Sequence, residues 1–259
     1  MELGRLGVWT SPRGIGDAAL LPDAAALAER LGYGTFWLGG SPQLPTVQQL
    51  LDATESIVIA TGIVNVWTVE PETLARQFDE LESDRVLLGI GIGHPEATQE
   101  YRAPLTVMRE FLDRLDVPKE RLCLAALGPK MLELSKERTL GAAPYFTPAA
   151  HTRVAREQLG AGTLIAPEVA FVLGDDVGVA RDYAQGYLAL GNYARNLERL
   201  GYADLASDSV LADVVPHGSV ETIEANVQAH FDAGADHVCV QALGEPGIPE
   251  QGWTALAPR

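Results

Sequence analysis

The feature that most constrains this chain is a regular alternation of apolar, β-rich runs with helical patterns from one end to the other. Strands are expected where aliphatic and aromatic residues form short unbroken runs, at residues 6–10, 35–39, 57–66, 86–92, 121–126, 143–146, 164–173 and 235–241. Helices are expected between them, at residues 21–31, 47–53, 71–82, 98–115, 130–138, 148–159 and 249–256, with two or three more within 176–231. Apolar strands that alternate with helices predict a parallel sheet covered by helices.

Eight such units in 259 residues fit one α/β domain, a single (β/α)₈ TIM barrel that spans residues 1–259. The competing arrangement is a doubly wound open sheet, which carries a glycine-rich turn after its first strand. Residues 11–16, which read Ser-Pro-Arg-Gly-Ile-Gly, lack that fingerprint. The sequence therefore favours the barrel, in which residues just past each strand line the active-site face.

The charge balance excludes one broad class of partner. The formal net charge is −16, whereas a protein that binds nucleic acid needs a basic surface for the phosphate backbone. The same charge disfavours anionic membranes, and the sequence has no apolar run of about 18 residues. Cys123 and Cys239 lie within apolar strands, so we expect two buried free thiols and a cytoplasmic location. A small phosphorylated ligand remains compatible with this charge.

The residues expected at the mouth of the barrel are mostly glycines and aromatics, among them Trp9, Gly39, Gly40, Trp67, Gly93 and Phe146. They include no carboxylate cluster, no histidine pair at metal spacing and no cysteine–histidine pair, so no metal site is expected. Such a mouth suits a flat ring that brings its own chemistry. His94 is the only histidine expected at a strand end, and the unperturbed histidine pKa of about 6.5 suits proton exchange at neutral pH. It is the candidate catalytic residue, and the alternative of a purely structural histidine stays open.

Five segments carry a resemblance to a known family. Residues 83–94, Ser-Asp-Arg-Val-Leu-Leu-Gly-Ile-Gly-Ile-Gly-His, resemble the Ser-Gly-Gly-Arg-x-x-Leu-Gly-x-Gly segment of the bacterial luciferase-like oxidoreductases. Residues 31–38 and 60–65 look like the second and third strands of that family. Residues 126–130 and 141–147 are similar to the two cofactor-phosphate segments of the branch that uses coenzyme F420, a deazaflavin.

The resemblance implies an F420-dependent oxidoreductase that transfers a hydride between the reduced deazaflavin and a small organic substrate. It implies a non-proline cis peptide bond between Gly62 and Ile63 behind the ring, with Asn65 nearby. It also implies that the cofactor phosphate is bound by Leu127, Gly128, Pro129, Lys130 and Thr147. The turn at Gly128 opens a helix whose first N–H groups attract anions, which supports the same interpretation.

The chain also departs from the family. Some F420-dependent members carry an acidic residue and a histidine after the second strand, where this chain has Gly39, Gly40 and Ser41. An FMN-dependent luciferase-like monooxygenase is therefore a second hypothesis, and a non-catalytic flavin-binding barrel dimer is a third. Plain packing roles for Gly89, Gly91, Trp9 and Trp67 also stay open, as does a solvated Lys130.

A homodimer is expected, because the second and third long helices carry more apolar residues than one barrel-facing stripe needs: Val47, Leu50, Leu51, Leu74, Phe78 and Leu81. The alternative is that all six face the barrel.

Overall fold

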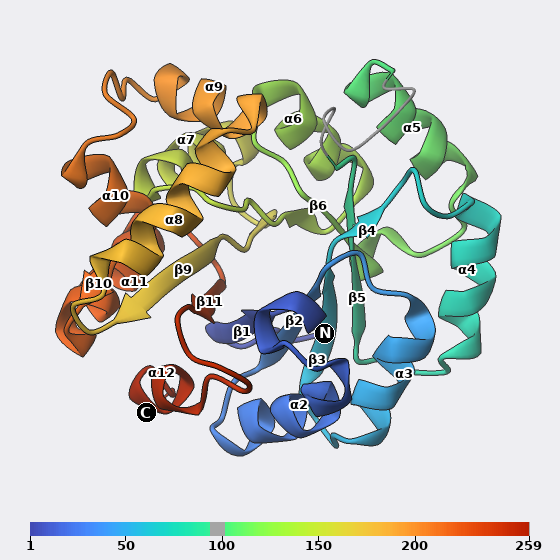
Figure 1. The fold of residues 1–259 in the computed structure, drawn as a ribbon. Helices are drawn as coiled ribbons and strands as arrows, with labels where there is room; N and C mark the ends of the chain where they lie inside the picture. The colour runs from blue at the N-terminus through green and yellow to red at the C-terminus, as the bar shows by residue number, and fades with distance from the viewer. Residues whose placement is uncertain (94–101, 259) are drawn as a thin grey trace.

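The fold is a ring of parallel strands surrounded by helices (Figure 1). The computed structural model describes residues 1–93 and 102–258. Its strands are β1 (Leu6–Thr10), β2 (Thr35–Gly39), β3 (Val58–Gly62), β4 (Val64–Asn65), β5 (Val86–Gly91), β6 (Leu122–Leu124), β7 (Gly141–Ala142), β8 (Leu164–Ile165), β9 (Glu168–Leu173), β10 (His217–Gly218) and β11 (Val238–Ala242).

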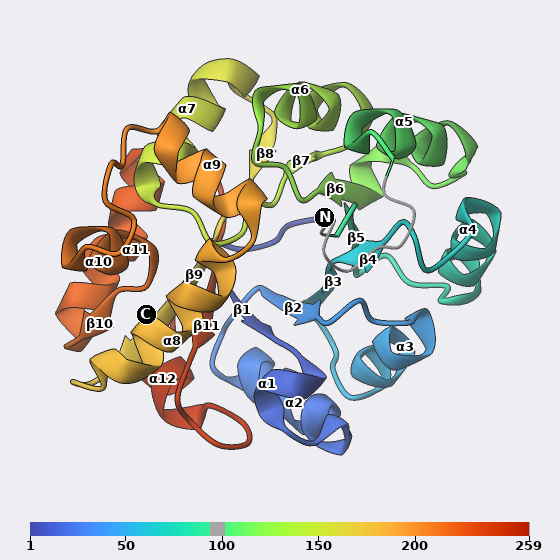
Figure 2. The same cartoon turned by 45° about the horizontal axis from the view of Figure 1, so that its top comes forward.

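The helices alternate with the strands along the chain, and most of them surround the strands, as the turned view shows (Figure 2). They are α1 (Pro12–Ile15), α2 (Leu21–Arg30), α3 (Leu44–Asp52), α4 (Pro71–Glu80), α5 (Pro104–Arg114), α6 (Pro129–Arg138), α7 (Ala149–Leu159), α8 (Val177–Leu188), α9 (Gly191–Arg199), α10 (Asp208–Val214), α11 (Val220–Asp232) and α12 (Glu250–Ala255). Short 3₁₀ turns lie at Ala18–Leu20 and Lys119–Arg121. None of the described helices combines the length and the apolar character needed to cross a membrane.

The barrel closes through a strand that a proline interrupts. Parallel pairing runs from β11 through β1, β2, β3, β5, β6 and β7 to β8, and β9 pairs with β11. Pro167 separates β8 from β9 because proline has no N–H for the ladder. The N–H of Glu168 donates to the carbonyl of Pro144 at 2.9 Å, and the N–H of Cys239 donates to that of Pro167 at 3.0 Å. The interrupted strand therefore bridges both neighbours, and the expected TIM barrel is confirmed.

Most of the apolar residues of α3 and α4 face inward. Val47 and Leu50 are fully buried, and Leu51, Leu74 and Leu81 are also buried, whereas Phe78 is only partly covered. The apolar residues of α3 and α4 from which we expected a homodimer thus pack against the barrel itself. The dimer stays a prediction, without support from these residues.

Arg85, from the segment that resembles the luciferase-like motif, has a packing role. Its guanidinium donates to the carbonyls of Leu51 at 3.1 Å, Thr54 at 3.0 Å and Ile57 at 2.9 Å. Carbonyls at the end of a helix have no partner within that helix. Arg85 therefore ties the end of α3 to the start of β3.

Three expected elements differ from the structure. The sixth strand is Gly141–Ala142 rather than residues 143–146, because the chain turns at Phe146, whose φ is 52°. The segment 176–231 holds α8, α9, α10 and α11 instead of two or three helices. The helix expected from residue 98 is observed over Pro104–Arg114, while residues 98–101 lie outside the described part of the chain.

Candidate functional site

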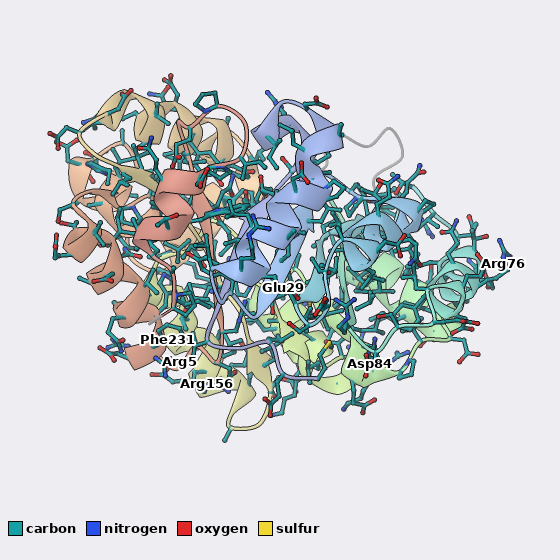
Figure 3. All side chains as sticks on the ribbon, turned by 90° about the horizontal axis from the view of Figure 1, so that it is seen from below. Arg5, Glu29, Arg76, Asp84, Arg156 and Phe231 are labelled. Carbon is teal, nitrogen blue, oxygen red and sulfur yellow. The ribbon has the colours of Figure 1, made fainter. Side chains whose placement is uncertain are left out.

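A cavity of about 390 Å³ opens at the carboxyl ends of the strands, where the sequence predicts the mouth. A larger cavity of about 660 Å³ lies at the opposite end, beside Arg5 and Phe231. In that region, seen from below in Figure 3, the guanidinium of Arg5 lies 4.1 Å from the ring centroid of Phe231. Because functional residues of (β/α)₈ barrels lie at the carboxyl ends of the strands, the smaller cavity is the candidate site.

One wall of the cavity is aromatic. Trp9, at the end of β1, and Tyr145, after β7, both line it, and their ring centroids are 5.2 Å apart. The indole lies so close to β2 and β3 that a Cβ atom at Gly39 would be 2.1 Å from it, and one at Gly62 would be 2.5 Å away. Both glycines are therefore required to make room for Trp9, which is at once a packing residue and part of the cavity wall.

A second wall is formed by Gly62, Ile63 and Asn65, three of the residues expected at the cofactor. The peptide bond between Gly62 and Ile63 is cis, as the resemblance implied. The Ile63 side chain lies over Gly91, where a Cβ would be 2.6 Å from its Cγ1, so Gly91 relieves crowding inside the barrel. The N–H of Asn65 donates to Ser41 Oγ at 3.2 Å, and its Oδ1 accepts from the N–H of Trp67 at 3.1 Å. The expected ring-binding residues thus lie together at the mouth.

Opposite this wall lies a carboxyl group that the sequence analysis missed. Glu168, the first residue of β9, is 2% exposed and lines the cavity. Its Oε2 accepts the N–H of Phe146 at 3.2 Å, and its Oε1 has no hydrogen-bond partner. Burial raises the pKa of Glu168 to about 8, although the Phe146 N–H and the Tyr183 hydroxyl act in the opposite direction. The carboxyl is thus mostly protonated at neutral pH.

A network of hydroxyl groups surrounds this carboxyl. The Tyr145 hydroxyl donates to Gln241 Oε1 at 2.8 Å, and the Tyr183 hydroxyl reaches the same oxygen at 3.1 Å. The Tyr187 hydroxyl donates to that of Tyr145 at 3.2 Å. Burial raises the pKa of Tyr145 well above its ordinary value, so this hydroxyl stays neutral and its proton is used within the network. Helix α8 supplies Tyr183 and Tyr187, and the rule that collects residues just past each strand does not reach them.

The expected phosphate-binding residues lie outside the cavity lining, at the start of α6 and α7. Gly128 caps α6 without a side-chain hydrogen bond, and a Cβ there would lie 3.5 Å from a guanidinium nitrogen of Arg199. The carbonyl of Leu127 bonds to Nε2 of His151 at 3.0 Å, which joins the two helix starts. Thr147 is 2% exposed, and its hydroxyl has no hydrogen-bond partner. Pro129 and Lys130 are exposed at the first turn of α6.

The histidines divide into one candidate and four structural residues. His94 lies outside the described residues. The other four are hydrogen-bonded within the fold. His237 bonds to Trp37 Nε1 at 3.0 Å and to the carbonyl of Gly4 at 2.8 Å, and burial lowers its pKa to about 4. The remaining three have one partner each, at Leu127 for His151, Thr152 for His230 and Val215 for His217.

Neither metal ligation nor disulfide formation is visible in the described part of the chain. No group of three or more acidic, histidine or cysteine side chains there is placed to hold a metal ion. Cys123 and Cys239 are buried free thiols, as expected, and burial raises the pKa of Cys123 to about 12. These thiols are therefore unreactive packing residues at neutral pH.

Comparison with known proteins yields a family match and fold neighbours. Residues 3–117 match the model of the luciferase-like monooxygenase family, which confirms the resemblance over this part of the chain. No curated protein sequence matches the chain.

Solved structures with the same fold span nearly the whole chain. An F420-dependent secondary alcohol dehydrogenase in complex with an F420-acetone adduct is 13% identical with a TM-score of 0.72, and covers 99% of this chain and 97% of its own. The coenzyme F420 dependent tetrahydromethanopterin reductase from Methanopyrus kandleri is 14% identical with a TM-score of 0.72, covering 98% and 97%. The oxygenating constituent of 3,6-diketocamphane monooxygenase of Pseudomonas putida, in complex with FMN, is 15% identical with a TM-score of 0.68, covering 98% and 97%. At these identities the likeness is one of fold.

Proposed function

We propose a function on the premise that residues 3–117 belong to the luciferase-like monooxygenase family. The chain is an oxidoreductase that binds a flavin-type redox cofactor at the mouth of the barrel, with coenzyme F420 as the first candidate. The observation that carries this proposal is the cavity between the Trp9–Tyr145 wall and the Gly62–Ile63–Asn65 wall. Apolar and aromatic walls with a few polar groups are typical of sites for flat organic ligands.

The residues near α6 and α7 fit the phosphate of such a cofactor. The missing side chain at Gly128 leaves space beside the guanidinium of Arg199, and the buried hydroxyl of Thr147 has no partner within the fold. Buried polar groups are rarely left without a partner, so an unpaired hydroxyl supports a ligand at this position. We propose that Leu127, Gly128, Pro129, Lys130 and Thr147 form the phosphate site, with Arg199 as an added cation.

A bound deazaflavin supplies a hydride to an organic substrate. The chain contributes orientation: Trp9 and Tyr145 pack against one side of the bound ligand, and Ile63 packs from the other wall. The buried lining removes water from the space between them, which strengthens electrostatic interactions with a substrate. His94 stays a candidate for proton exchange on the basis of its sequence position.

FMN is the second candidate cofactor, because a structure of the same fold is a monooxygenase constituent in complex with FMN. In that case the chain is an FMN-dependent luciferase-like monooxygenase. The partners proposed for either activity are a small-molecule substrate and a second copy of the chain. The two buried free thiols suit the reducing cytoplasm.

The test is a fluorescence titration of the purified protein with F420 and, separately, with FMN. Gly128→Val is the diagnostic variant, because Gly128 has a φ of −87° and ψ of 155° that valine tolerates, while the branched side chain fills the phosphate space. Loss of one charge-assisted hydrogen bond, about 1.5–3 kcal/mol, weakens binding by roughly ten- to a hundredfold. Lys136→Ala, on the exposed side of α6, is the control and should bind like the parent. Equal binding by Gly128→Val and the parent would place the phosphate elsewhere.

A further inference from the structure

Glu168 is a buried carboxyl group in the cavity wall to which the proposed function assigns no role. A carboxyl group that only supported the fold would have both oxygens paired, because an unpaired buried polar atom is costly. Here Oε2 has the Phe146 N–H, whereas Oε1 is buried without a partner in a wall of the candidate site. Oε1 is therefore the one position of this carboxyl that no group of the described fold satisfies.

The surroundings hold the carboxyl in its place. Phe146, whose N–H contacts Oε2, has a φ of 52°, which is rare for a bulky residue. Its ring is fixed by stacking on Tyr187 with centroids 5.1 Å apart and by an edge contact with Tyr193 at 5.6 Å. These contacts maintain the unusual backbone that directs the Phe146 N–H to Glu168.

The groups that face Glu168 carry no charge at neutral pH. They come from the segment after β7, from α8, from α9 and from β11, and are Tyr145, Tyr183, Tyr187, Tyr193 and Cys239. Burial raises the pKa of every one of them. The positive charge of Arg13 in α1 acts to lower the pKa of Tyr187, against the larger effect of burial. No described cation is paired with Glu168, so nothing in this wall stabilises its ionised form beyond the Phe146 N–H and the Tyr183 hydroxyl.

We propose that Glu168 is the proton donor and acceptor for the reaction at the barrel mouth, acting on a neutral substrate with a carbonyl oxygen or a conjugated enone. The inference rests on the proposed function. It gives the chain a proton source on the β9 side of the barrel, whereas the segment after β2, Gly39-Gly40-Ser41, offers no carboxyl or imidazole.

In the direction of substrate reduction, a hydride from the reduced cofactor forms a C–H bond at the electrophilic carbon. The O–H bond of Glu168 breaks, and its proton forms the new O–H bond of a carbonyl substrate, or the second new C–H bond of an enone. A proton released from the reduced cofactor together with its hydride would restore the Glu168 acid, so that protons and electrons balance. The substrate is reduced by two electrons and the cofactor is oxidised by two. Tyr145 and Tyr187, which line the cavity, pack beside the substrate and position it next to Glu168.

The first experiment reads the protonation state directly and needs no cofactor. Infrared difference titration of the parent should show an un-ionised carboxyl band at neutral pH that is lost as the pH rises through about 8. The band should be absent from Glu168→Gln and retained by Glu157→Gln, whose side chain is exposed on α7. A parent without such a band at neutral pH overturns the inference, whatever the variants do.

The second experiment follows oxidation of reduced F420, and separately of reduced FMN, by cyclohexenone. Glu168→Gln should bind the cofactor like the parent, but turn over about 10²–10⁴-fold more slowly and lose the fall in rate above the Glu168 pKa. Glu168→Asp should recover part of the rate, and Glu157→Gln all of it. An unchanged rate and pH profile in Glu168→Gln overturns the inference while leaving the proposed function intact. Failure of both cofactors to bind the parent overturns the proposed function, and the infrared titration still decides whether Glu168 is held as an acid.

Discussion

Replacement of Glu168 by glutamine should stabilise the fold at neutral pH and remove one component of its pH dependence. The pKa of Glu168 is raised from 4.5 to about 8 in the folded chain. The contribution of Glu168 to the unfolding free energy is therefore fully present below a pH of 4.5 and is lost as the pH rises towards about 8. In that interval only the unfolded chain releases the proton. Each pH unit in this window lowers the unfolding free energy of the parent by about 1.4 kcal/mol, which amounts to about 3 kcal/mol at pH 7.

Glutamine has the same shape as the protonated acid and does not ionise. Its amide oxygen keeps an acceptor for the Phe146 N–H, and its NH₂ group takes the place of the oxygen that has no partner in the parent. Urea unfolding of both proteins at intervals from about pH 5 to about pH 8 should give curves that diverge by about 1.4 kcal/mol per pH unit. Glu157→Gln, on the exposed face of α7, should follow the parent. Parallel curves for the parent and Glu168→Gln over this interval would show that the carboxyl is ionised in the folded protein, and would refute the reasoning.

Three further predictions concern Glu29, the proposed phosphate site and the homodimer. Glu29 accepts the N–H groups of Ser56 at 2.6 Å and Ile57 at 2.8 Å, and although burial acts to raise its pKa, these donors hold it at about 2. Since this pKa is depressed, the stabilisation is present above 4.5 and is lost as the pH falls towards 2. Glu29→Gln should lower the unfolding free energy at pH 7 by about 1–2 kcal/mol after allowance for solvent exposure, and equal denaturation midpoints there would contradict this. Thr147→Val should leave the melting temperature unchanged or raise it, because its hydroxyl has no partner, and should weaken cofactor binding roughly tenfold in a fluorescence titration; full affinity would exclude the hydroxyl from the site. Light scattering at micromolar concentration should give the mass of a homodimer, and a monomer mass would dismiss that prediction.

The barrel was predictable because its signal is distributed along the chain. Each strand is an apolar run and each helix has its own period, so a misplaced boundary such as that of β7 does not disturb the alternation. β7 itself was misplaced because Gly141 and Ala142 lack the β-branched side chains that mark a strand, and because the backbone at Phe146 ends the extended run. The dimer argument failed for a different reason: the sequence does not show how wide a helix face the barrel covers.

The candidate site was predictable only where a local motif carried it. Gly62, Ile63 and Asn65 are close in sequence, so one short motif was enough to group them. Glu168 stands alone in an apolar run, directly after Pro167. A single acidic residue inside an expected strand was the available signal, because such a residue is almost never buried without a partner or a function. The tyrosines that α8 and α9 place at the mouth could not be predicted from the strand pattern, because their positions depend on how a long segment folds back over the mouth.

The close contacts of Trp9 with Gly39 and Gly62 mean that residues on three strands, β1, β2 and β3, together set the space at this wall of the cavity. A side chain at either glycine cannot coexist with the indole, because the two would occupy the same volume. Change at these positions is therefore contingent: a larger residue on β2 or β3 becomes acceptable only after β1 has exchanged its tryptophan for something smaller. In a barrel with these contacts, a smaller residue must replace the tryptophan on β1 before a larger residue can replace either glycine. Steric exclusion, and not the chemistry of the ligand, therefore sets the order of the substitutions.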